Sequence, residues 1–194
     1  PGVRPGKVVI IGGGVVGIAA ATIAHGMRAD VSILDVSLSK LQEIDRLFSG
    51  EVKTIASSAY DIEKELIEAD LVVGAVLVHG AKAPKLVTNK LVSKMKPGSV
   101  LVDVAIDQGG CFEDSRATTH AEPTYKVHNS IFYCVANMPG AVPATSTYAL
   151  ANATIKYDLK NSFSSFSHSA LEETGFQRPM FGLKAVEVSQ DPLS

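Results

Sequence analysis

The sequence feature that most constrains the fold is a glycine-rich turn between an apolar run and a helical stretch. Residues 7–11 (KVVII) are mostly β-branched and show no polar alternation, which is typical of a strand buried on both faces of a parallel sheet. They lead directly into GGGVVG at 12–17, and an alanine-rich stretch follows through about Arg28. This order predicts a strand, a tight turn and a helix packed back on the strand.

The spacing of the glycines predicts a dinucleotide-binding turn. Gly12 allows the sharp bend, Gly14 lets the backbone approach a pyrophosphate, and Gly17 lets the helix pack closely on the strand. The pyrophosphate would lie at the helix N-terminus, where free N–H groups favour negative charge. Asp35 ends the next apolar run, where a carboxylate binds ribose hydroxyls and repels a 2′-phosphate. We therefore expect NAD rather than NADP; the alternative is a glycine turn without a ligand.

The same alternation of apolar runs and helical stretches continues along the chain. It predicts an α/β fold with a doubly wound, mostly parallel sheet of the Rossmann type. The expected strands cover residues 7–11, 31–34, 52–55, 71–78, 100–106 and 131–135. The expected helices are the alanine-rich stretch after Gly17 through about Arg28, a stretch capped by Ser37, and residues 62–69, 85–95 and 143–154. Residues 107–129 form a polar stretch.

The expected domain organisation is an NAD-binding domain over residues 1–157 and a divergent tail over 158–194. The tail is serine-rich at 161–169 and shows no clean period. The chain opens with PGVRPG and no initiator Met, which looks like an interdomain linker of a longer protein.

Two further polar residues follow expected strands at the edge where ligands bind in open parallel sheets. Asp107 precedes Gly109 and Gly110, and Asn137 precedes a turn and a helix. For either residue, a simple turn-forming role is the alternative. Asp103 lies inside its strand, and we interpret it as structural. His120 and His128 lack partners at ligand spacing, so no metal site is expected. His25 is interpreted as a surface or core residue, and His79 as a loop residue, with a place in the cofactor crevice as the alternative.

Composition and charge exclude several classes of function. The formal net charge is -2, which gives no drive toward nucleic acid or an anionic membrane surface. No apolar run reaches the ~18 residues needed to span a bilayer, and no signal peptide is evident, so a cytoplasmic protein is expected. Cys111 and Cys134 show no disulfide or metal spacing and are expected to be reduced, buried thiols.

Longer blocks make the sequence more specific. These blocks are GGGVVG at 12–17, VSILD at 31–35, GAVLVHGAKAPKLV at 74–87, MKPGSVLVDVAIDQGGCFEDSR at 95–116, TTH at 118–120 and FYCVANMPGAVPATSTYAL at 132–150. With these blocks the chain resembles the NAD-binding domain of alanine dehydrogenases, a family related to the soluble domain of proton-translocating transhydrogenase. The resemblance covers roughly residues 1–157, and AIDQGG and VANMPGAVP are its most diagnostic parts.

The resemblance implies roles for individual residues. Asp35 would hold the adenosine ribose, with Lys40 and Ser57 near the adenosine, and Asp107 matches the catalytic aspartate of the family. The other positions implied to line the cofactor are Val15, Val16, Val76, Leu77, Val104, Ala105, Ile106, Arg116, Val135, Ala136, Asn137 and Met138.

The implied reaction is the reversible, NAD-dependent oxidative deamination of L-alanine to pyruvate and ammonia. In the family a histidine, an arginine and a lysine of a separate N-terminal substrate domain complete the site, and we expect that domain to be absent from this sequence. This chain alone is then expected to bind NAD without turnover. Two alternatives stay open, a standalone NAD(H)-binding or regulatory module and a transhydrogenase-type nucleotide domain. The resemblance also implies a homo-oligomer.

Overall fold

The core of the protein is one seven-stranded sheet in the strand order β3-β2-β1-β4-β5-β7-β6. A computed structural model describes residues 2–76 and 83–165, with side chains up to residue 155. All neighbouring strands pair in parallel except β6 and β7, which pair antiparallel. The strands are β1 (Lys7–Ile11), β2 (Asp30–Asp35), β3 (Lys53–Ala56), β4 (Leu71–Gly74), β5 (Val100–Asp103), β6 (Thr124–Val127) and β7 (Ser130–Tyr133). The predicted doubly wound, mostly parallel sheet is confirmed.

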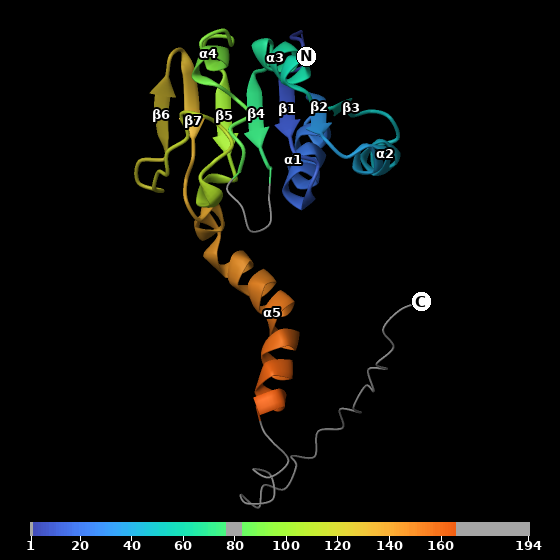
Figure 1. The fold of residues 1–194 in the computed structure, drawn as a ribbon, viewed down its shortest axis with the longest axis vertical. Helices are drawn as coiled ribbons and strands as arrows, with labels where there is room; N and C mark the ends of the chain where they lie inside the picture. Colours follow the sequence, from blue (N-terminus) through green and yellow to red (C-terminus); the bar gives the residue numbers. More distant parts are fainter. Residues whose placement is uncertain (1, 77–82, 166–194) are drawn as a thin grey trace, which may run out of the picture. The chain divides into compact units, whose positions relative to one another are not determined.

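The strand order reverses direction between β1 and β4. One half of the sheet grows from β1 through β2 to β3, and the other grows from β4 through β5 to β7. The carboxyl ends of β1, β4 and β5 lie at one edge, the lower edge in Figure 1, whereas β6 runs the other way. Ligands of open α/β sheets bind at this edge, at the point where the strand order reverses.

The helices begin where the sequence supplies caps. They are α1 (Val15–Gly26), α2 (Leu38–Leu47), α3 (Ala59–Ile67), α4 (Asn89–Val92) and α5 (Pro143–Ser165), with 3-10 turns η1 (Ile106–Gln108) and η2 (Met138–Ala141). The Ser37 hydroxyl accepts a hydrogen bond from the backbone N–H of Lys40, as predicted, and Ser58 and Thr88 cap α3 and α4 in the same way.

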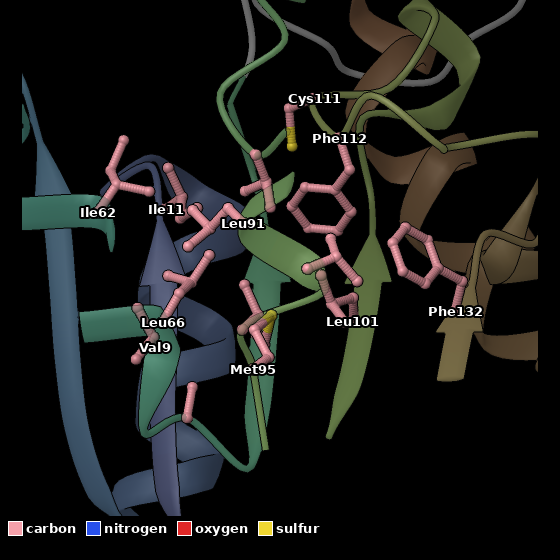
Figure 2. Close-up of a cluster of buried hydrophobic side chains, with 14 of the residues drawn as sticks. Val9, Ile11, Ile62, Leu66, Leu91, Met95, Leu101, Cys111, Phe112 and Phe132 are labelled. Carbon is pink, nitrogen blue, oxygen red and sulfur yellow. The ribbon is translucent and has the colours of Figure 1, made fainter. Parts of the chain in front are cut away.

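Strand β1 is buried on both faces of the sheet, because its alternate residues belong to different hydrophobic clusters. Val8 and Ile10 pack with Ile33 and Ile44 in a cluster that includes Ala21 of α1. The larger cluster, on which Leu66 of α3 packs, contains Val9, Ile11, Leu101, Phe112 and Phe132. Figure 2 shows these side chains converging, with Phe112 and Phe132 at one end of the cluster. Their rings meet edge to face at 5.9 Å. Burial on both faces explains why β1 shows no polar alternation.

Several element boundaries differ from the predicted ones. The helix predicted over residues 85–95 is only the short α4, because the preceding stretch is extended and pairs with the polypeptide after β5. Leu86 N donates to Cys111 O, and Val87 bridges Phe112. Strands β4 and β5 end earlier than predicted, at Gly74 and Asp103. Residues 124–127, in the polar stretch 107–129 for which no strand was predicted, form the edge strand β6.

The chain divides into two compact units, Pro1–Ala141 and Val142–Ser194. The sheet lies in the first unit. Helix α5 belongs to the second unit and is longer than the predicted helix over residues 143–154. Our functional division of the chain at residue 157 stays a prediction. None of the helices in the described part of the chain combines the length and the apolarity needed to cross a membrane.

Candidate functional site

In the glycine turn after β1, a Cβ on either of two glycines, Gly12 or Gly17, would clash with backbone atoms. Gly12 has φ +106, and a Cβ there would lie 2.6 Å from the Ala75 carbonyl oxygen. A Cβ on Gly17 would lie 1.9 Å from the Gly12 carbonyl oxygen, so Gly17 lets α1 pack against the turn. A Cβ on Gly14 would meet no atom within 4 Å. The turn therefore leaves open space at Gly14, the position predicted to approach a pyrophosphate.

The N-terminus of α1 lies beside this open space. No side chain in the described ranges caps the helix, and its first turn contains no acidic residue. Val15 and Val16, the first residues of α1, are 88% and 46% exposed. Uncapped N–H groups and exposed apolar side chains at one helix start match what the pyrophosphate and the adjoining apolar parts of a dinucleotide require.

The structure brings Asp35 to the mouth of the glycine turn. One Asp35 carboxylate oxygen accepts a hydrogen bond from Gly13 N at 2.7 Å, and the other accepts from Ser37 N at 2.8 Å. Ser57 N donates to the Asp35 carbonyl at 2.9 Å, and Lys40 N donates to the Ser37 hydroxyl. Asp35, Lys40 and Ser57 are all half-buried. Asp35 and Ser57 thus lie together at the ends of β2 and β3, while Lys40 lies in the first turn of α2.

The end of β4 closes the opposite side of the turn. Ala75 N donates to the Ile11 carbonyl, and the half-buried Val76 follows it. A Cβ on Gly12 would lie 3.1 Å from Val76 N, so Val76 borders the turn, and its contact with the cofactor stays a prediction. Leu77, predicted beside it, lies outside the described residues.

The predicted catalytic residue Asp107 lies in η1, and it is exposed at the carboxyl edge of the sheet. Val104 is half-buried, whereas Ala105 and Ile106 are each 8% exposed and pack into the hydrophobic core. Ala105 and Ile106 therefore contribute mainly backbone at this edge. The Gln108 side-chain oxygen is buried, and no group in the described ranges 2–76 and 83–165 donates to it.

Arg116 is exposed, and its guanidinium lies 4.1 Å from the centroid of the Tyr125 ring. The Tyr125 hydroxyl accepts from Arg116 N at 2.9 Å and donates to the Asp114 carbonyl at 2.8 Å. Burial raises the pKa of the Tyr125 phenol, so the hydroxyl keeps its proton at neutral pH. Strand β6, which the sequence analysis missed, thus supplies the support for Arg116.

The last predicted segment, 135–138, follows β7. Val135 is fully buried, Ala136 and Met138 are half-buried, and Asn137 is exposed with a left-handed φ of 56°. A ring nitrogen of His120 lies 3.1 Å from the Asn137 carbonyl oxygen. Asn tolerates this backbone conformation better than most residues. Within the segment, Asn137 is the residue that presents a polar side chain to solvent.

A large apolar groove lies on the sheet face beside α1 and reaches the glycine turn only at Val16. Its volume is about 1080 Å³, and its walls include Val8, Ile23 and Val73. Val16 and Val104, two predicted cofactor-lining residues, border the groove. No carboxylate among the described residues lines it, so the groove lacks the acid that would hold a ribose.

The two cysteines are buried and unpaired, as expected. Burial and the adjacent Asp103 carboxylate raise the pKa of the Cys111 thiol, and burial raises the pKa of Cys134. A raised pKa suppresses the thiolate, so neither residue has the character of a nucleophile.

The family model described as "Alanine dehydrogenase/PNT, C-terminal domain" matches residues 1–182. The chain belongs to this family. The match continues past residue 157, where the resemblance seen in the sequence ended, to residue 182.

Relatives within the alanine dehydrogenase/PNT family are close in sequence. An alanine dehydrogenase of Mycolicibacterium smegmatis is 61% identical over 160 residues, and one of Geobacillus stearothermophilus is 59% identical over 161 residues. Each match covers 82% of this chain and 43% of the relative, so the chain spans less than half the length of these proteins.

Solved structures agree with this family membership. An L-alanine dehydrogenase superposes with a TM-score of 0.81 at 49% identity, covering 90% of this chain and 48% of that one. A transhydrogenase from Sinorhizobium meliloti superposes with a TM-score of 0.70 at 28% identity, covering 79% of this chain and 44% of the other.

Proposed function

We propose that this chain is the NAD-binding part of an alanine dehydrogenase that interconverts L-alanine with pyruvate and ammonia. The observation that carries the proposal is the Asp35 carboxylate at the mouth of the glycine turn, 2.7 Å from Gly13 N and beside the open space at Gly14. This arrangement favours ribose hydroxyls next to a pyrophosphate and disfavours a 2′-phosphate.

The residues present fit a bound dinucleotide. The backbone of Gly14, Val15 and Val16 would hold the pyrophosphate, while Asp35, Lys40 and Ser57 would hold the adenosine side. The nicotinamide side would lie over Asp107 and Asn137, near the ends of β5 and β7. The buried side-chain oxygen of Gln108, which has no donor within residues 2–76 and 83–165, marks a place at this edge where a bound N–H donor would be favourable.

The role of the chain in the reaction follows from these positions. Bound NAD supplies the hydride acceptor that the oxidation of an amino acid needs. The glycine turn and Asp35 would fix the orientation of the cofactor. The exposed carboxylate of Asp107 would accept or return a proton at the carboxyl edge of the sheet, which is the role of a general acid–base residue.

We propose that the groups that recognise L-alanine lie in the part of the relatives' sequences that is not matched by this chain. The matched relatives extend well beyond this chain, which covers 43% of them. We therefore propose a separate substrate domain as a partner, and a homo-oligomeric, cytoplasmic enzyme. A standalone NAD(H)-binding module and a transhydrogenase-type nucleotide domain are the competing functions. Identities of 61% and 59% to alanine dehydrogenases, against 28% to a transhydrogenase, favour the dehydrogenase.

The proposal is tested by titrating NADH into the wild-type chain, followed by an alanine and NAD turnover assay on the same sample. Asp35→Ala should weaken NADH binding by about tenfold or more, because it removes a charge-assisted hydrogen-bond acceptor. Asp45→Ala, which removes an exposed carboxylate of α2, is the matched control and should bind NADH like the wild type. Equal binding by both variants would refute the proposed site. Turnover of alanine by this chain alone would refute the need for a separate substrate domain.

A further inference from the structure

The polypeptide after β5 forms a compact loop, residues 104–116, here called the 104–116 loop. It carries two residues of the proposed site, the exposed Asp107 near its start and the exposed Arg116 at its end. Little regular structure holds it, since η1 (Ile106–Gln108) is its one helical turn in the described chain. Another source of order must therefore fix the positions of Asp107 and Arg116.

That source is the side chain of Asp103, the last residue of β5. Asp103 is 0% exposed, and its carboxylate accepts hydrogen bonds from backbone N–H groups throughout the loop. Ala105 N donates at 3.1 Å, Cys111 N at 2.9 Å and Phe112 N at 3.2 Å. The Ser115 hydroxyl also donates to the carboxylate. One buried side chain thus connects the start, the middle and the end of the loop.

These donors replace the water that a buried carboxylate loses. Among the described residues no lysine or arginine forms an ion pair with Asp103, so hydrogen bonds alone stabilise its charge there. Hydrogen bonds to a charged group are the stronger kind, and leaving such a group unsatisfied is costly. Gly110, with φ +74, lets the backbone close around the carboxylate, because a Cβ there would lie 2.6 Å from Asp103 Oδ2. The loop is therefore built around this side chain.

The ammonium of Lys85 holds the same stretch by its carbonyl groups. Its Nζ donates to the Gly109 carbonyl at 2.6 Å and to the Phe112 carbonyl at 2.8 Å. Residues 109–112 are thus bound through their N–H groups by a carboxylate and through their carbonyls by a cation. Phe112 is also anchored by its ring in the hydrophobic core, beside Phe132 (Figure 2).

We propose that Asp103 is the positioning residue of the site, which sets Asp107 and Arg116 against the nicotinamide half of the cofactor. This inference rests on the proposed function. Asp107 lies between the anchored Ala105 and Cys111, and Arg116 directly follows the anchored Ser115. Asp103 acts on both residues through the backbone. The adenosine half is bound by Asp35 on β2, on the other side of β1 and β4 in the sheet order.

The test compares the affinities for NADH and for ADP-ribose, which lacks the nicotinamide. Asp103→Asn keeps the shape of the side chain but removes its charge and places an NH2 group against N–H or O–H donors. Ser115→Ala is the milder second variant, in case Asp103→Asn does not fold. Two matched controls lie at the opposite edge of the sheet. Asp70→Asn alters a carboxylate that accepts from Lys7 N at 2.7 Å, and Ser99→Ala removes a buried hydroxyl 2.8 Å from that of Ser130.

We expect Asp103→Asn to weaken NADH about tenfold while ADP-ribose changes less than about twofold, since the lost charged hydrogen bonds support one half of the site. Ser115→Ala should shift the ratio in the same direction, and neither control should shift it. Hydrogen exchange at the amides of Cys111 and Phe112 should accelerate in Asp103→Asn. Equal weakening of both ligands, or an unchanged ratio, would overturn the positioning role. If the wild-type chain bound neither ligand, the proposed function would fail, and this inference with it.

Discussion

At the scale of single residues, the glycines of the turn meet two different requirements. Some are needed for the fold, and others are needed for the proposed ligand. Gly17 is needed for the fold, because a Cβ there would lie 1.9 Å from the Gly12 carbonyl oxygen. At Gly14 a Cβ would meet no atom within 4 Å, and the backbone is extended with φ -74 and ψ -171, so the fold does not require glycine there. The requirement at Gly14 comes from the proposed ligand.

This difference gives a paired prediction. Gly17→Ala should lower the free energy of unfolding by about 1–3 kcal/mol, because helix α1 must move away from the turn. Gly14→Ala should leave the unfolding transition unchanged yet weaken NADH binding, because its methyl group occupies the space proposed for the pyrophosphate. Chemical denaturation and NADH titration of both variants measure the two effects. A Gly14→Ala variant that binds NADH like the wild type would place the pyrophosphate elsewhere.

At the scale of elements, the sequence predicts a helix or strand well where its local residue pattern is compatible with only one kind of structure. Buried parallel strands such as β1 and β2 appear as unbroken β-branched runs, and Ser37 marks the start of α2. The predicted helix over residues 85–95 is largely wrong because Leu86 and Val87 pair with the 104–116 loop in an extended conformation, so the helix begins only at Asn89. The hydrophobic periodicity of a segment carries no information about a pairing partner that lies so far away in the sequence.

The candidate site is predictable to a similar degree. The group around Asp35 follows from spacing and from the resemblance, since its members lie at or just after strand ends. The residues that hold the 104–116 loop in place, Asp103 and Lys85, cannot be predicted in this way. The position of Asp103 inside its strand indicates a structural residue, but its hydrogen bonds to Cys111 and Phe112 depend on a loop conformation that no local pattern indicates. Lys85 carries no distinguishing sequence feature at all.

At the scale of the whole molecule, two cysteine thiols and one tyrosine phenol, all buried or half-buried, make the free energy of unfolding fall at alkaline pH. Burial raises the pKa of Cys111, Cys134 and Tyr125 in the folded state. Below the unfolded-state values, both states keep these protons and the full stability is present. Above about pH 9 the unfolded chain releases its thiol protons first, so the free energy of unfolding falls as pH rises.

Denaturant unfolding at a series of pH values measures this effect. The free energy of unfolding should be nearly flat between about pH 7 and pH 8 with respect to these groups, and should decline above about pH 9. The double variant Cys111→Ser and Cys134→Ser serves as the control, because serine does not titrate in this range and its decline should be shallower. An identical decline in both proteins would assign the effect to other groups.

The central claim is that the carboxyl edge of the sheet binds NAD through the glycine turn and Asp35. The most direct measurement is the ratio of the dissociation constants for NADPH and NADH, in the wild-type chain and in Asp35→Ala. We predict that the wild type binds NADH at least about tenfold more tightly, because the Asp35 carboxylate repels a 2′-phosphate, and that Asp35→Ala largely removes the difference. Equal affinity of the wild type for both dinucleotides, or a preference that survives in Asp35→Ala, would contradict the account.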